Sequence, residues 1–217
     1  TQDMVEEAKK LLDAMGVPWV QAPSEGEAQA AYMAMKGDVW ASASQDYDSL
    51  LYGAPRLVRN LTISGKRRRP GGRGYIEVEP ELIILEEVLR HLGVTREQLI
   101  DIAILIGTDY NPDGVKGVGP KTAYKLIKTY GSLERALTKL PQAKFPVSPG
   151  EIKRVFLEPK VTDNYALKWQ RPSKDKIVEI LVEEHDFSPG RVLKAVERAE
   201  KAYRERFLQR GLEFWFG

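Results

Sequence analysis

The chain has 217 residues, with 33 Lys and Arg against 31 Asp and Glu, so its formal net charge at pH 7 is +2. Hydrophobic residues make up 42% and charged residues 29%, which is typical of one or two globular domains and excludes a largely disordered chain. The lack of cysteine excludes a disulfide framework, thiolate zinc sites and a cysteine nucleophile, and only two histidines argue against a histidine-built metal site.

The first half of the chain alternates predicted helices with predicted strands. Helices are predicted over residues 4–15 and 24–36, strands over 17–20, 39–43, 56–62 and 75–78, and a loop over 65–74. Such alternation favours an α/β domain with a mainly parallel sheet. The opening residues carry no apolar secretory segment and no initiator Met, so we expect the chain to begin inside a larger protein.

The second half is predicted to be helical. Helices are expected over residues 81–91, 95–106, 121–130, 132–140, 173–184 and 188–206, and residues 141–172 form a connecting region with a short helix at most. Thr95 and Gln98 have the spacing of a capping box at the start of one of these helices.

Five acidic residues follow apolar elements or begin a helix. They are Glu25, Glu27, Asp46, Asp48 and Asp109. In open α/β sheets ligands gather outside the carboxyl ends of the strands, and hard carboxylate oxygens suit Mg²⁺ or Mn²⁺. Two such ions about 4 Å apart can hold the attacking and the leaving oxygen of a phosphodiester displacement.

Structural roles compete with this interpretation. Ser24 and Glu27 fit a capping box, and Asp46 fits the cap of the next helix. Spacing alone leaves the metal site and these structural roles equally open.

Residues 115–123 read Val-Lys-Gly-Val-Gly-Pro-Lys-Thr-Ala, the pattern of a helix-hairpin-helix turn. Glycines let a backbone approach a phosphate closely, and the N-terminus of the following helix supplies free N–H groups. The residues expected to bind DNA there are Lys116, Gly117, Gly119 and Lys121. The alternative is a plain glycine-rich connection with solvated lysines. Five cations within residues 66–73 either follow a nucleic-acid backbone or form a solvated loop.

With these motifs in hand, the chain resembles the internal nuclease region of flap endonucleases, the structure-specific 5′-nucleases. The resemblance rests on residues 23–28, 45–48, 107–110 and 117–121, and residues 111–114 are similar to the archaeal branch. It implies a PIN-like α/β core with a helix–two-turn–helix module. It also implies Mg²⁺-dependent cleavage of 5′-flap DNA and 5′–3′ exonuclease activity, used in DNA replication (Okazaki fragment maturation) and repair.

The resemblance also implies roles for individual residues. Glu25 and Glu27 match the family's first metal site, and Asp46, Asp48 and Asp109 match the second. A complete site would hold two Mg²⁺, for which Mn²⁺ can substitute. Glu25, Gly107 and Asp109 match positions that face substrate DNA, and the hairpin matches an element that holds duplex phosphate through a bound K⁺.

The last residues carry a separate signal. Gln209, Leu212, Trp215 and Phe216 have the spacing of a peptide that binds a sliding clamp of the PCNA type. The alternative is a tail that packs on its own domain.

The family's N-terminal segment, which contributes two further metal-ligand aspartates, has no counterpart in residues 1–24. We therefore expect residues 1–106 to form the C-terminal part of the nuclease core, 107–140 the helix–two-turn–helix module, 141–207 a connecting region with C-terminal helices, and 208–217 the clamp peptide. The leading interpretation is a cytoplasmic flap endonuclease completed by that segment. The alternatives are a non-catalytic DNA- and clamp-binding fragment, or another member of the superfamily such as a junction resolvase or an exonuclease.

Overall fold

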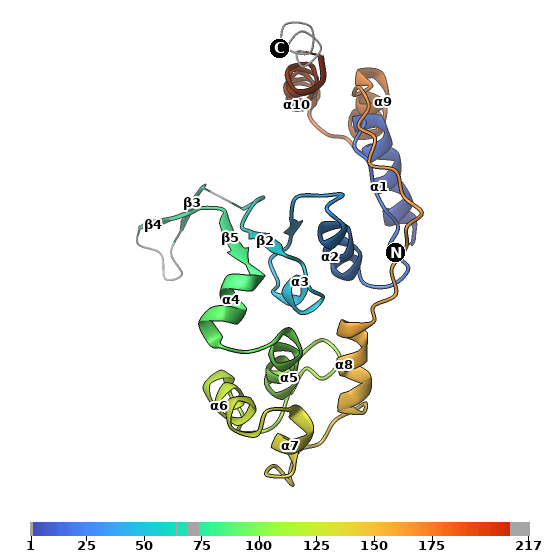
Figure 1. The fold of residues 1–217 in the computed structure, drawn as a ribbon. Coiled ribbons are helices and arrows are strands. Elements are labelled where there is room, and N and C mark those ends of the chain that lie inside the picture. Colours follow the sequence, from blue (N-terminus) through green and yellow to red (C-terminus); the bar gives the residue numbers. More distant parts are fainter. Residues whose placement is uncertain (1, 64, 69–73, 209–217) are drawn as a thin grey trace, which may run out of the picture. The chain divides into compact units, whose positions relative to one another are not determined.

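The computed structural model describes residues 2–63, 65–68 and 74–208 (Figure 1). The chain divides into two compact units, Ala22–Thr162 and Thr1–Gln21 with Asp163–Gly217. These units group segments by packing, so the four functional ranges expected from the sequence remain a prediction. Within the described ranges, no helix has the length and apolar character needed to cross a membrane.

A three-stranded sheet lies in the larger unit. Its order is β1 (Ser42–Ala43), β2 (Arg56–Arg59) and β5 (Glu81–Ile84). The pair β1–β2 is parallel and the pair β2–β5 is antiparallel, with Leu57 of β2 opposite Ile83 of β5. Leu57 is fully buried and packs in one cluster with the buried Leu50 and Leu85. The sheet with its helices confirms the α/β class, but its parallel character is limited to β1–β2.

Three local predictions were wrong. Residues 17–20 form no strand, and Pro18 there has no N–H to donate to a ladder. Residues 81–84 form β5 instead of the start of a helix, because they pair with β2; the helix α4 begins only at Leu85 and runs to Leu92. Residues 65–68, predicted as loop, form β3 (Gly65–Arg68), which pairs antiparallel with β4 (Tyr75–Val78).

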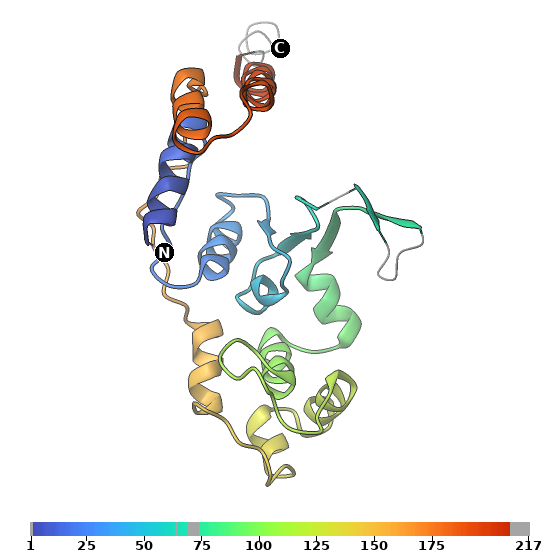
Figure 2. The ribbon, with the colours of Figure 1, turned by 180° about the vertical axis from the view of Figure 1, so that it is seen from behind.

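Four other helices of the larger unit lie close to their predicted positions: α2 (Gly26–Lys36), α5 (Arg96–Ile106), α6 (Pro120–Tyr130) and α7 (Leu133–Leu137). The short helix α3 (Asp48–Leu51) has no counterpart among the predicted ranges, and α8 (Pro149–Leu157) lies in the region predicted to hold a short helix at most. The capping box of Thr95 and Gln98 is present at the start of α5, which confirms that prediction. Helices α5 to α8 gather in one group away from the sheet, as both views show (Figures 1 and 2). Their core is continuous with the residues that carry the acidic cluster described below.

A buried ion pair ties these helices together. Asp101 of α5 is 1% exposed, and its carboxylate lies 2.9 Å from the ammonium of Lys153 on α8. The same carboxylate accepts a hydrogen bond from the backbone N–H of Leu133, the first residue of α7, at 3.1 Å. Burial raises the pKa of Asp101, and the hydrogen bond and charge of Lys153 oppose that rise. Three helices are therefore fixed by one carboxylate.

The smaller unit is helical. It contains α1 (Gln2–Met15), α9 (Lys174–Val178) continued by the π-helix η1 (Glu179–Glu184), and α10 (Pro189–Tyr203) continued by η2 (Arg204–Leu208). Its core holds Ala14, Ile177, Ile180, Val192 and Val196. Helix α1 is followed by Gly16, where φ is +68° and an added Cβ would lie 2.2 Å from a backbone oxygen of residue 170. Residues 209–217 of the predicted clamp peptide, with Gln209, Leu212, Trp215 and Phe216, lie outside the described residues.

Candidate metal centre

The five acidic residues come from three segments of the larger unit. Glu25 is the N-cap of α2 and Glu27 lies in its first turn, while Asp46 precedes α3 and Asp48 begins it. Asp109 lies in the turn that follows α5. Glu27 and Asp48 are partly buried, and the other three carboxylates are exposed.

The five carboxylates lie close enough for their negative charges to repel one another, which is seen in the pKa values of the two partly buried ones. Burial is the largest cause of the raised pKa of Glu27, to which repulsion from Asp46, Asp109 and Glu25 adds. Burial also raises the pKa of Asp48 to about 6, with further repulsion from the other four. The fold therefore brings every predicted acidic site residue into one negatively charged cluster, hereafter the acidic cluster.

The structural alternatives for these acids are wrong. The N-cap of α2 is Glu25, not Ser24, and no side chain caps that helix. The N-cap of α3 is Tyr47, again with no side-chain cap, so Asp46 does not fill that role. Glu27 instead accepts a hydrogen bond from Ser44. Neither acid is needed to start its helix, which leaves both free to serve the cluster.

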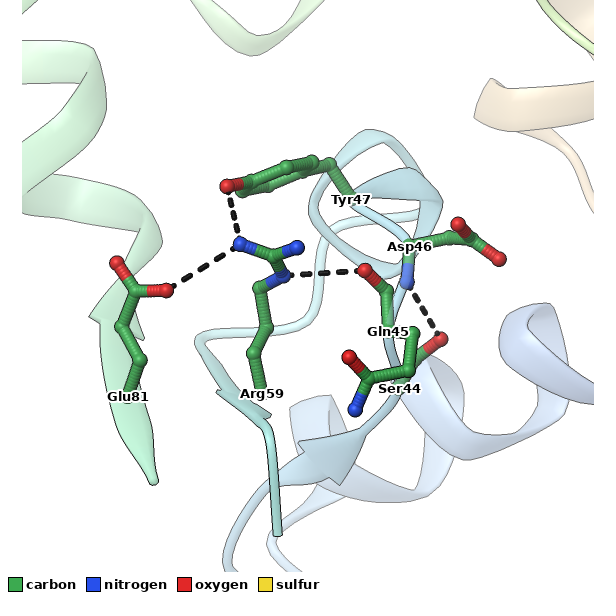
Figure 3. Close-up of polar contacts among 6 residues, drawn as sticks. All are labelled: Ser44, Gln45, Asp46, Tyr47, Arg59 and Glu81. Atoms are coloured by element: carbon green, nitrogen blue, oxygen red, sulfur yellow. Dashed lines mark hydrogen bonds and ion pairs between the residues drawn. The ribbon is translucent and has the colours of Figure 1, made fainter. Parts of the chain in front are cut away.

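Polar contacts hold the segment that carries Asp46. The Ser44 hydroxyl that donates to Glu27 also accepts the backbone N–H of Asp46 at 3.1 Å. Arg59 donates from Nε to the carbonyl of Gln45 at 3.0 Å, and from its terminal nitrogen to the Tyr47 hydroxyl and, at 3.2 Å, to Glu81. The carboxylate of Asp46 points away from this arginine (Figure 3). Arg59 therefore does not neutralise the carboxylate of Asp46, whose negative charge adds to that of the acidic cluster.

Two tyrosines adjoin the acidic cluster. The hydroxyl of Tyr110 donates to Glu25 at 3.3 Å and lies 3.3 Å from the hydroxyl of Tyr52. Sequence reasoning missed both tyrosines, and also Ser44, as supports of the site. The only signal was their place beside the acidic motifs, since Tyr110 follows Asp109 directly.

The donor set fits hard divalent cations. Carboxylate oxygens are the ligands that Mg²⁺ prefers, and a cation would offset both the burial and the repulsion that raise the pKa of Glu27 and Asp48. Over the described ranges, one group of three Asp, Glu, His or Cys residues has its ligand atoms all within 4.8 Å of one another. It consists of Glu7, Glu184 and His185, in the smaller unit. The acidic cluster is more widely spaced, which suits Mg²⁺ that keeps several of its waters.

The predicted hairpin has its apolar residues inside and its glycines and lysines outside. Val115 and Val118 are 3% and 8% exposed, and the N–H of Val118 donates to the carbonyl of Val115 at 2.9 Å. Gly117 has φ +83°, and a Cβ added at Gly117 or Gly119 would meet nothing within 4 Å. Lys116 and Lys121 are exposed on either side of these glycines.

The hairpin also leads directly into a helix N-terminus. Gly119 is the N-cap of α6, and no side chain caps its first N–H groups. An open backbone surface with flanking cations is suited to phosphate. On the other side, Gly107 ends α5 with φ +130°, and a Cβ there would lie 2.7 Å from the carbonyl oxygen of Pro112. Only glycine thus allows the tight turn that presents Asp109.

The known proteins to which this chain is similar are flap endonucleases and their structural relatives. The family described as the XPG I-region matches residues 16–109. Flap endonuclease 1 of Staphylothermus marinus is 62% identical over 218 residues, covering 100% of this chain and 62% of that protein. Flap endonuclease 1 of Ignicoccus hospitalis is 65% identical over 206 residues, covering 95% of this chain and 58% of that protein. The chain thus spans about three fifths of the length of these curated relatives.

Solved structures agree on the fold. The flap endonuclease-1 from Methanococcus jannaschii superposes with a TM-score of 0.81 at 51% identity, covering 95% of this chain and 60% of that chain. The catalytic core of Rad2, in complex with DNA substrate, gives a TM-score of 0.72 at 21% identity, covering 90% of this chain and 68% of that chain. The second match shows the fold alone.

Proposed function

We propose that this chain, which is similar to archaeal flap endonucleases over nearly its whole length, carries the metal-binding and DNA-holding parts of a structure-specific 5′-flap endonuclease with 5′–3′ exonuclease activity. The observation that supports this most is the acidic cluster, because five carboxylates from three segments repel one another and two have raised pKa values. A protein gains nothing in stability from such an arrangement, so a cationic ligand is the simplest reason to keep it.

In this proposal the acidic cluster holds Mg²⁺, with two ions in a complete site and Mn²⁺ as a substitute. Glu27, Asp46, Asp48 and Asp109 supply most of this chain's ligand oxygens, and Glu25 supplies the fifth carboxylate. Metal held by these carboxylates would supply a water of lowered pKa and positive charge for the leaving oxygen of the phosphodiester. Ser44 holds Glu27 and the Asp46 backbone in register for that ligation. No side chain of the set is required as a general base.

The hairpin is proposed to hold duplex DNA by its backbone. Lys116 and Lys121 attract phosphates, while Gly117 and Gly119 allow close approach to the free N–H groups of α6. A K⁺ bound at the turn fits this role. Gly107, with Glu25 and Asp109, would face the substrate DNA.

The remaining proposals concern the setting of the reaction. Residues 208–217 would bind a PCNA-type sliding clamp through Gln209, Leu212, Trp215 and Phe216. We place the enzyme in the cytoplasm of an archaeal cell, in replication and repair. The segment by which the relatives are longer would complete the metal site.

Cleavage of labelled 5′-flap DNA tests the function. Because the chain spans about three fifths of its relatives' length, the assay uses a polypeptide extended to their full length, with Mg²⁺. Asp48→Ala should abolish cleavage and keep flap binding in Ca²⁺, whereas Asp113→Ala, which changes an exposed acid outside the acidic cluster, should cleave normally. Retained cleavage by Asp48→Ala would refute the site.

The same assay separates the alternatives. An extended wild type that binds DNA and clamp but does not cut would be a non-catalytic module. Faster cutting of a four-way junction than of a flap would identify a resolvase.

A further inference from the structure

A hydrogen-bonded pair of tyrosines links the three segments that carry the acidic cluster. The hydroxyl of Tyr110 donates to Oε1 of Glu25 at 3.3 Å. A tyrosine hydroxyl has one proton, so the 3.3 Å contact between Tyr110 and Tyr52 must be donated by Tyr52. The order of donation is therefore Tyr52 to Tyr110 to Glu25.

Each tyrosine is attached to an acidic segment. Tyr52 directly follows α3, the helix that begins with Asp48, and Tyr110 is the residue after Asp109. Glu25, which accepts the hydrogen bond from Tyr110, lies in the third acidic segment, at the N-terminus of α2. The two contacts thus connect loops that lie 58 and 85 residues apart in the sequence.

Packing fixes both aromatic rings. Phe156 of α8 is fully buried, with its ring centroid 5.0 Å from that of Tyr52 and 5.8 Å from that of Tyr110, the latter edge to face. Tyr52 is 2% exposed, and Arg96 donates to its carbonyl at 2.9 Å. Rings held in this way have few alternative rotamers, so their hydroxyls are presented at fixed positions.

Buried polar contacts also fix the backbone of Tyr110. The side chain of Asn111 donates to the carbonyl of Ile104 at 2.7 Å and accepts from the hydroxyl of Thr108 at 2.6 Å. Thr108 and Asn111 are 9% and 2% exposed. By contrast, the carboxylate of Glu25 is exposed and makes no capping bond in α2. In this hydrogen bond Tyr110 is therefore the rigid partner, and it restricts the otherwise exposed side chain of Glu25.

We propose that Tyr110 is a positioning residue for Glu25 and that Tyr52 orients Tyr110 for this role. The proposal rests on the proposed function, because it takes Glu25 as a metal ligand. The bond uses one carboxylate oxygen and leaves the second for the cation. Without this hydrogen bond, the Glu25 side chain loses its conformational freedom only when the metal binds. That entropy cost reduces the free energy of binding and weakens the affinity.

Manganese binding to the 217-residue chain tests the proposal. Free Mn²⁺ gives a sharp paramagnetic resonance signal that is lost on binding, so a titration gives the dissociation constant. Tyr110→Phe should weaken Mn²⁺ binding about tenfold, as loss of a partner of a metal ligand commonly does. Tyr52→Phe should weaken it about threefold, since Tyr110 keeps its own proton. Tyr124→Phe is the matched control, because that hydroxyl donates to the carbonyl of Leu92 at 2.8 Å instead of to an acid, and its affinity should equal wild type.

A double-mutant cycle separates positioning from general structural damage. In a Glu25→Gln background, Tyr110→Phe should have no further effect on Mn²⁺ affinity, because its target is gone. An equal loss in both backgrounds would overturn the proposal, and so would wild-type affinity in Tyr110→Phe. If Tyr110→Phe does not fold, Tyr52→Phe in the same cycle decides by the same criterion. A wild type that binds no Mn²⁺ would overturn the proposed function and this inference together, whereas a wild type that binds Mn²⁺ but shows either of the contrary results above would overturn this inference alone.

Discussion

Replacing Asp48 by Asn should stabilise the metal-free chain while removing its response to metal. The fold raises the pKa of Asp48 from 3.8 to about 6. A shift of about two units corresponds to about 3 kcal/mol against the ionised form, and because Asp48 is only half buried, solvent screening reduces this to about 1 kcal/mol. For a chain of this size, that raises the melting temperature by about 2–4 °C.

The pH dependence follows from the sign of the shift. Because the folded pKa lies above the unfolded one, the folded state binds the extra proton, and wild-type stability falls as pH rises from about 4 to about 6. The advantage of Asp48→Asn should therefore be complete above pH 6 and absent below pH 4.

Thermal unfolding followed by circular dichroism, in EDTA at pH 7.5 and at pH 4, measures both effects. Asp113→Asn is the control and should match wild type. Adding Mg²⁺ at pH 7.5 should raise the melting temperature of wild type, through binding to the folded state, but not that of Asp48→Asn. A variant that melts at or below wild type in EDTA at pH 7.5 would refute this reasoning.

Three further predictions concern the framework around the site. Lys153→Met leaves the buried carboxylate of Asp101 without its cation and should cost about 3 kcal/mol in urea unfolding; a loss below about 1 kcal/mol would show that the ion pair is not needed. Gly114→Ala should reduce the free energy of unfolding by about 3 kcal/mol, because its Cβ would lie 2.1 Å from the last carbonyl oxygen of α5. Gly117→Ala, where a Cβ would lie in open space, should reduce it by about 1 kcal/mol. Equal losses in the two variants would contradict the steric argument. Lys116→Ala should lower the slope of log affinity for duplex DNA against log salt by about one, and an unchanged slope would remove this lysine from the phosphate contacts.

Local chemistry made most helix boundaries predictable. The capping box of Thr95 and Gln98 begins α5, and α1 ends at Met15, as the sequence predicted. The errors arose where a distant partner decides the structure. Residues 81–84 are a strand because β2 lies beside them, and β3 is a strand through backbone pairing with β4, which its cationic side chains do not signal.

The same division applies to the site. The acids could be chosen from the sequence because each lies in a short motif next to an apolar element, and the fold does bring them together. Their supports could not, because the partners are far apart: Ser44 is 17 residues from Glu27, and Tyr110 is 85 residues from Glu25. A hydroxyl carries no sign of its partner until the fold places it.

Anomalous diffraction from crystals of the chain soaked in Mn²⁺ would test the metal centre most directly. We predict an anomalous peak among the carboxylates of Asp46, Asp48 and Asp109, within about 2.5 Å of their oxygens. A second peak about 4 Å away would agree with the two-ion mechanism. A saturated crystal whose only peak lies at Glu7, Glu184 and His185, or one with no peak in the acidic cluster, would contradict the proposed metal centre.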